Sequence, residues 1–181
     1  MNKDFSSFVA RWRVPFGFAL GVAYLIFAQP TLPLLVAGSI VALMGLCIRA
    51  YASGYLEKDH ALAMSGPYAY TRNPLYLGSL FIGIGLVLAG AQWILGMAFV
   101  IFFLLVYVPV MRREEKNLRQ RFGQKYDEYA SAIPLFLPYR KPLRLPTGRF
   151  DWRRYRNNRE YEAALGYLIG VIFLIAKILL R

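Results

Sequence analysis

The residues best suited to chemistry gather between positions 60 and 78, in a polar and aromatic stretch between two apolar blocks. Here Asn73 followed by Pro74 predicts a helix start, because Asn can cap the first free amides and Pro suits the first helical position. The positive end of that helix would favour an anionic ligand group, and Arg72 would add a full positive charge beside it. Helix capping and anchoring of Arg72 at lipid headgroups would explain the same residues without any ligand.

Two adjacent carboxylates, Glu114 and Glu115, lie on a second predicted helix over residues 111–122, with Gly123 as its stop. The apolar residues that share the face of Glu115, at three- and four-residue spacing, are Met111, Leu118 and Phe122. Burial of an unpaired carboxylate is costly. Glu115 therefore requires a partner or a ligand, with Glu114 at the edge of the same stripe.

The elements that must position these residues are long apolar segments. Of the 181 residues, 57% are hydrophobic and 18% are charged, and the mean hydropathy is +0.39, which indicates that the solvent is lipid. A transmembrane helix needs about 20 apolar residues, and five segments meet or approach this length: 14–28, 32–55, 75–89, 93–110 and 163–180. We therefore expect an all-α, polytopic integral membrane protein. Short links predict that helices one and two, and three and four, form antiparallel hairpins, and Pro109 should kink the fourth.

The net charge of +12 is distributed unevenly along the chain. Basic residues crowd into the N-terminal tail and into segments 56–74 and 112–160, which five spans would place on one side, and the positive-inside rule makes that side cytoplasmic. The same placement argues against nucleic acid as a partner. Segment 138–159 is rich in Pro, Arg and aromatic residues and suits a strap at the membrane interface. A lone Cys47 and a lone His60 argue against a disulfide and a metal site.

Several short motifs follow one another in a fixed order between residues 60 and 138. They are Gly66-Pro67-Tyr68, Arg72-Asn73-Pro74, Tyr76, Gly78, Glu114-Glu115-x-x-Leu118, Phe122-Gly123-x-x-Tyr126-x-x-Tyr129 and Ile133-Pro134. In order and spacing they resemble the isoprenylcysteine carboxyl methyltransferase family, whose wider superfamily includes phospholipid N-methyltransferases. The resemblance implies S-adenosylmethionine as cofactor, in a membrane-embedded pocket closed from the cytoplasm by the loop and the C-terminal helix.

The resemblance also implies roles for individual residues. The expected cofactor-binding residues are His60, Ala61, Leu62, Ala63, Tyr68, Asn73, Pro74, Leu75, Tyr76 and Glu114. Arg72 and Glu115 are assigned to catalysis, and either glutamate could contact the amino group or sugar of the cofactor. We expect one domain, with a first hairpin (1–56), a catalytic core (57–138) and a basic strap with the fifth helix (139–181). The expected acceptor is a membrane lipid or a lipidated molecule that offers a carboxylate, thiol or amine.

Asn73 departs from the family pattern, which usually has His between the Arg and the Pro. Asn retains a donor and an acceptor but cannot titrate near neutral pH. A non-catalytic membrane scaffold or lipid-binding protein of the same fold therefore stays an alternative, as does an NADPH-dependent, sterol-reductase-like enzyme. The expected location is a bacterial or archaeal cytoplasmic membrane, or the endoplasmic reticulum of a eukaryote, with the active site facing the cytoplasm.

Overall fold

The computed structural model describes residues 3–57, 61–138 and 148–180, and only the backbone of residues 3–14. The described residues form helices and no strands, as the apolar pattern predicts. The helices are α1 (Lys3–Phe27), α2 (Leu32–Ser53), the 3₁₀ turn η1 (Gly66–Ala69), α3 (Pro74–Gly90), α4 (Trp93–Phe102), the π-helical turn η2 (Phe103–Tyr107), α5 (Val108–Phe122), α6 (Gln124–Ala132), α7 (Trp152–Asn157) and α8 (Tyr161–Leu179).

Three helical stretches are long and apolar enough to cross a membrane, namely Leu32–Ser53, Trp93–Phe122 and Tyr161–Leu179. Two apolar helices, Pro15–Phe27 and Pro74–Gly90, are shorter. The all-helical, polytopic membrane fold is thus confirmed, whereas the number of five spans stays a prediction.

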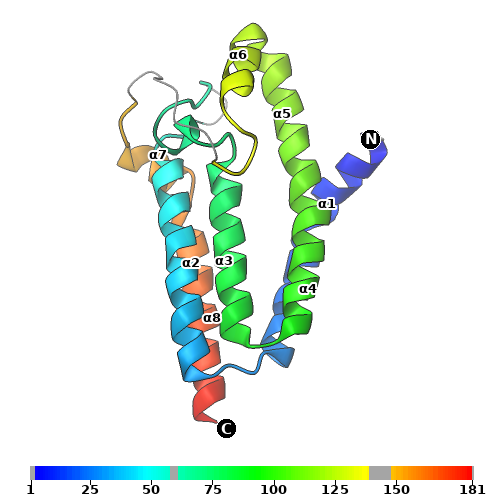
Figure 1. Ribbon diagram of the computed structural model, residues 1–181, viewed down its shortest axis with the longest axis vertical. Coiled ribbons are helices and arrows are strands. Elements are labelled where there is room, and N and C mark those ends of the chain that lie inside the picture. Colours follow the sequence, from blue (N-terminus) through cyan, green and yellow to red (C-terminus); the bar gives the residue numbers. More distant parts are fainter. Residues whose placement is uncertain (1–2, 58–60, 139–147, 181) are drawn as a thin grey trace.

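The two ends of the helix bundle differ in composition. The turns that join α1 to α2 and α3 to α4 lie at one end, together with the C-terminus of α8 (Figure 1). The N-terminus, η1, α6 and α7 lie at the other end (Figure 1). The segments that hold most of the basic residues therefore gather at a single end, which we call the basic end.

Small residues bring α2 and α3 into close contact along their length. A Cβ atom at Gly45 would lie 2.5 Å from the carbonyl oxygen of Gly78, and one at Gly38 would clash with the backbone of Gly85 and Ala89. Such small-residue faces let membrane helices approach backbone to backbone. This contact makes α3 the main neighbour of α2.

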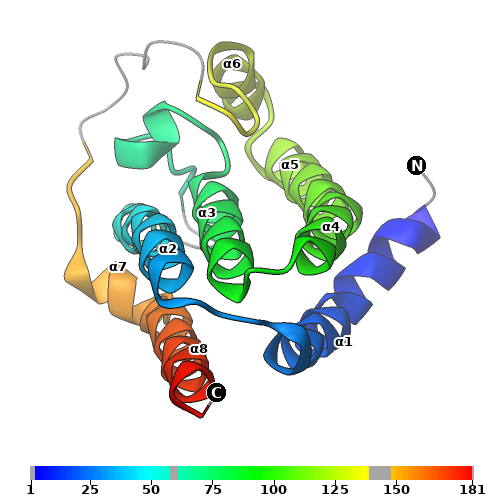
Figure 2. The same cartoon turned by 60° about the horizontal axis from the view of Figure 1, so that its bottom comes forward.

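The prediction that the first two helices form a hairpin is wrong. Within the described residues, α1 packs against α4, η2 and α5 and diverges from α2 (Figure 2). The physical reason is that the glycine face of α2 is already covered by α3. The predicted hairpin of α3 and α4 is present, joined at Ala91 in the left-handed conformation (φ 52°).

The fourth predicted helix continues through α4, η2 and α5 without a break in the helix. The kink predicted at Pro109 stays a prediction; a π-helical turn, Phe103–Tyr107, ends two residues before it. Proline has no amide proton and its ring crowds the preceding turn, so a widened turn accommodates it. As predicted, α5 ends at Gly123, which has a φ of 52°.

Candidate functional site

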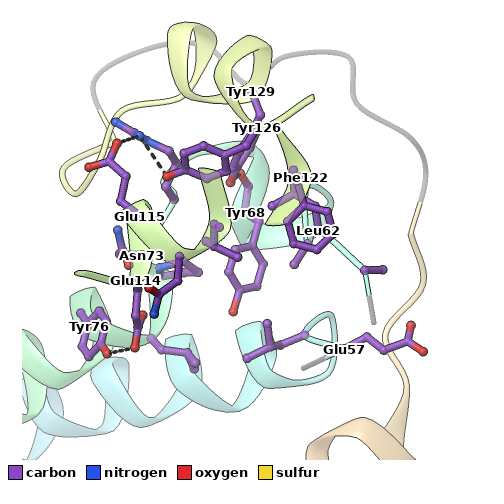
Figure 3. A pocket seen from close by; sticks show the side chains of 18 of the residues that line it. Glu57, Leu62, Tyr68, Asn73, Tyr76, Glu114, Glu115, Phe122, Tyr126 and Tyr129 are labelled. Atoms are coloured by element: carbon purple, nitrogen blue, oxygen red, sulfur yellow. Dashed lines mark hydrogen bonds and ion pairs between the residues drawn. The ribbon is translucent and has the colours of Figure 1, made fainter. Parts of the chain in front are cut away.

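A cavity of about 640 Å³ opens at the basic end, between the C-terminal end of α2, the first turn of α3 and helix α5. Figure 3 shows its walls. Its lining includes every predicted site residue that the structure describes: Ala61, Leu62, Ala63, Tyr68, Arg72, Asn73, Pro74, Leu75, Tyr76, Glu114 and Glu115. His60 lies outside the described residues. Residues that are as much as 54 positions apart in sequence thus share one cavity, as the motif order predicts.

Residues 71–73, directly before α3, are tied to a segment far downstream. Thr71 donates from its hydroxyl to the carbonyl oxygen of Phe136 at 2.6 Å, and the amide of Arg72 donates to the carbonyl oxygen of Pro134 at 3.0 Å. Asn73 occupies the N-cap position, but its side chain makes no capping bond. Its Nδ2 instead donates to the carbonyl oxygen of Leu135 at 2.9 Å. The prediction that Asn73 caps the free amides is therefore wrong, because the neighbouring segment uses its side chain.

Arg72 and Glu115 form an ion pair at the wall of the cavity. Nη1 of Arg72 lies 2.5 Å from Oε1 of Glu115 and 3.3 Å from the hydroxyl oxygen of Tyr126. The two charged side chains are only 13% and 21% exposed. The partner that the apolar stripe requires for Glu115 is thus Arg72, and the positive charge of Arg72 is largely neutralised. The Nε of Arg72 is buried and has no hydrogen-bond partner among the described residues.

Glu114, one residue earlier on α5, accepts a hydrogen bond from the hydroxyl of Tyr76 at 2.6 Å (Figure 3). The Tyr76 ring packs edge-on against Tyr107, with centroids 5.5 Å apart. Helices α3 and α5 are joined at this height by the hydroxyl–carboxylate contact. Glu114 is otherwise exposed and can accept a further donor.

Buried tyrosines close the cavity on the side of η1. The hydroxyl of Tyr129 donates to the carbonyl oxygen of Tyr68 at 2.7 Å, and both side chains are buried. Burial raises the pKa of Tyr68 and of Tyr129 well above the usual value. Both phenols are therefore neutral at physiological pH, and neither acts as a base there.

Several lining residues were not among the predicted site residues: Arg49, Leu56, Glu57, Ser79, Tyr107, Asn117, Leu118, Arg121, Phe122, Tyr126 and Tyr129. Tyr126 and Tyr129 belong to the motif that carries the family resemblance, so the sequence held a signal for them. Arg49 interrupts the last turns of an apolar segment, and an ionisable residue in such a place is itself a signal of function.

The described residues define a polytopic helical membrane protein with a charged, partly apolar cavity at its basic end. A sequence model of the phospholipid methyltransferase family matches residues 18–125. Because this match covers more than half of the chain, the chain belongs to the phospholipid methyltransferase family, a family of membrane methyltransferases.

Individual relatives share the same central region. The chain is 33% identical over 102 residues to the cobalt-zinc-cadmium resistance protein CzcN of Cupriavidus metallidurans, which covers 56% of this chain and 44% of that protein. It is 27% identical over 122 residues to the protein-S-isoprenylcysteine O-methyltransferase of Homo sapiens, covering 61% of this chain and 43% of that protein. The chain thus spans about half the length of the curated relatives it matches. No solved structure matches it.

Proposed function

We propose that the protein transfers a methyl group from S-adenosylmethionine to a lipid-like or lipidated acceptor at the cytoplasmic face of a membrane. The observation that carries this proposal is the single cavity that gathers all the described site residues of the family motifs at the basic end of the bundle. The basic segments at that end favour its cytoplasmic placement.

The donor set fits the cofactor. S-adenosylmethionine carries an ammonium, a carboxylate and a sulfonium, and the cavity offers carboxylates and arginines together with apolar and aromatic walls. The exposed carboxylate of Glu114 would bind the ammonium. The buried Nε–H of Arg72, which lacks a partner among the described residues, would bind an anionic group. A volume of about 640 Å³ lies within the usual range of small-molecule pockets.

When bound, the cofactor supplies an activated methyl group, and the residues of this chain supply alignment. The Arg72–Glu115 pair and the Tyr76–Glu114 contact fix α3 and α5 relative to each other, so groups bound between them are held at a constant separation. The buried tyrosines on the side of η1 exclude water. Alignment and exclusion of water are the contributions that methyl transfer requires from the protein.

The acceptor is best suited to the site if it is already ionised. Glu115 is paired with Arg72, and Tyr68 and Tyr129 hold their protons. Few groups in the described wall are therefore free to take a proton from an amine or a thiol. A carboxylate or a thiolate at the end of an apolar chain would need no base and would reach the cavity from the bilayer.

The test is calorimetric titration of the detergent-purified protein with S-adenosylhomocysteine, with NADPH in parallel. We expect saturable binding of S-adenosylhomocysteine alone, with affinity lost when Glu114 and Glu115 are both changed to Gln. The control is Glu128→Gln, which makes the same kind of substitution once, on exposed α6 outside the cavity. A folded protein that does not bind S-adenosylhomocysteine would overturn the proposal. Binding of NADPH would then indicate a reductase, and its absence a scaffold.

A further inference from the structure

A second ion pair lies beside the cavity and draws its acidic partner from the C-terminal helix. Nη2 of Arg49 lies 2.7 Å from Oε2 of Glu160, and Nε of the same guanidinium donates to that oxygen at 2.9 Å. The side chain of Glu160 is 8% exposed and that of Arg49 is 22% exposed. Arg49 lines the cavity, whereas Glu160 stands behind it at the start of α8.

Arg49 uses its other face to hold the first turns of α3. Its Nη1 donates to Oγ of Ser79 at 2.5 Å and to the carbonyl oxygen of Leu75 at 3.3 Å. Gly78 leaves room for this path, because a Cβ atom there would lie 2.5 Å from Cγ of Arg49. One guanidinium therefore connects α8 to the turn of α3 that the cofactor site uses.

The chain takes an uncommon conformation to place Glu160. Arg159, directly before it, has a φ of 56°, in the left-handed region that non-glycine residues rarely adopt. Just upstream, Nδ2 of Asn158 donates to the carbonyl oxygens of Ser53 and Leu56 at 2.9 and 3.0 Å, and so holds the C-terminal end of α2. The junction of α7 and α8 is thereby fixed against the segment that leads into the cavity wall.

The charges of the cavity show what this pair contributes. Among the described lining residues, the arginines Arg49, Arg72 and Arg121 equal in number the glutamates Glu57, Glu114 and Glu115. Glu160 adds one negative charge directly behind that wall. Burial is the main cause that raises the pKa of Tyr68, a residue of the cavity lining. The Glu160 carboxylate raises this pKa further and Arg49 lowers it, so the charges of the pair act on the cavity. Arg154, which pairs with the lining Glu57 at 2.8 Å, adds one positive charge in the same way. The described wall with these two outer partners is therefore balanced in charge, and loss of either Arg49 or Glu160 would change its preference between a positively charged and a neutral ligand.

We infer that Glu160 is a positioning residue of the cofactor cavity, which holds Arg49 against α3 and makes helix α8 a working part of the site. The inference rests on the proposed function and goes beyond it, because Glu160 lies outside the residues 18–125 that match the family. In this chain, a segment beyond the family match would tune the preference of the site for the positively charged donor over its neutral product.

The test compares the affinities of S-adenosylmethionine and S-adenosylhomocysteine, since the donor carries one more positive charge. In Glu160→Gln, the uncompensated Arg49 should lower the donor-to-product affinity ratio several-fold. In Arg49→Gln the ratio should rise, and in the double variant, whose pair is again neutral, it should return toward that of the wild type. A merely structural role would weaken both ligands alike and leave the ratio constant in all three variants, which would overturn the inference.

The matched control is Glu162→Gln, which removes the same charge from the same turn of α8, where Glu162 pairs with Arg159 in solvent at 54% and 69% exposure. Its ratio should equal that of the wild type. If the wild type binds neither ligand, the proposed function fails, whereas binding with a constant ratio overturns only the role of Glu160. Should a variant not fold, hydrogen exchange of the wild type decides: S-adenosylhomocysteine should slow exchange in residues 161–165, and protection confined to residues 61–79 would overturn the inference.

Discussion

Replacement of Glu115 by Gln distinguishes most clearly between the roles of the two adjacent carboxylates of α5, Glu114 and Glu115. Glu115 binds Arg72 at 2.5 Å, and both side chains are mostly withdrawn from water. Gln retains an acceptor oxygen but not the charge, so the guanidinium would keep only a neutral hydrogen bond and the 3.3 Å contact with the Tyr126 hydroxyl. We expect the variant to lose both stability and affinity for S-adenosylhomocysteine.

The magnitude follows from the exposure of the pair. Exposed ion pairs contribute less than 1 kcal/mol, whereas breaking a fully buried pair costs about 3–5 kcal/mol. At 13% and 21% exposure, and with an acceptor retained, Glu115→Gln should cost about 2 kcal/mol. For a chain of this length, that corresponds to a melting temperature lower by about 4–8 °C. If a further loss of about 2 kcal/mol appears in the bound state only, the affinity falls about thirtyfold.

The assay is thermal unfolding in detergent with and without S-adenosylhomocysteine, in a double-mutant cycle with Arg72→Gln. The coupling energy between the two positions should be about 2 kcal/mol. Glu114→Gln is the matched comparison, because Glu114 is exposed and accepts only from Tyr76 among the described contacts, so its loss should weaken ligand binding with little change in melting. Additive effects of Glu115→Gln and Arg72→Gln would refute the reasoning.

Substitutions at Gly85, Tyr129 and Asn73 test other parts of the structure. Gly85→Ala should cost about 1–3 kcal/mol by overpacking the contact with α2, whereas Gly170→Ala, which faces open space, should not destabilise, as melting curves would show. Tyr129→Phe should cost about 1–2 kcal/mol. Above pH about 10 the Tyr129 phenol ionises in the unfolded chain but stays protonated in the folded protein, where burial raises its pKa, so stability is lost as the pH rises. Tyr129→Phe should lessen this loss, because Phe cannot ionise. Asn73→Ala should cost about 1–2 kcal/mol by leaving the carbonyl of Leu135 with only the long 3.5 Å contact from the Thr71 hydroxyl, and Asn73→His should recover part of it.

For each of these predictions, one outcome would contradict it. Equal melting temperatures for Gly85→Ala and the wild type would mean that the helices separate without loss. If Tyr129→Phe loses stability at alkaline pH as steeply as the wild type, groups other than Tyr129 cause that loss. If Asn73→His melts no higher than Asn73→Ala, the donor at this position is not what holds the downstream segment.

Half of the described residues that line the cavity, 11 of 22, were predicted from the sequence, with the family resemblance as the main guide. The motifs around Arg72 and Glu115 are local, and a helix start at Pro74 and a helix stop at Gly123 depend on the chain nearby. The apolar segments also predict the membrane fold, because length and composition suffice. Features that depend on the neighbouring chain alone were thus accessible.

The partners of these residues could not be predicted, because they depend on packing between distant segments. Nothing near Asn73 indicates that its amide reaches Leu135, and the short link between α1 and α2 favours a hairpin that the glycine contact of α2 with α3 excludes. The pairing of Arg49 with Glu160 joins positions 111 residues apart. Local patterns cannot rank such long-range contacts against one another.

The cavity is built from residues of one central segment, but their geometry depends on tethers that come from elsewhere. Residues 71–73 are held by the carbonyl oxygens of 134–136, and the first turns of α3 are held through Arg49 by Glu160. Each tether ends on a charged or buried polar group, for which a lost partner costs more than the contact itself contributes. We therefore expect the start of α3 to keep its position only while both downstream segments are docked.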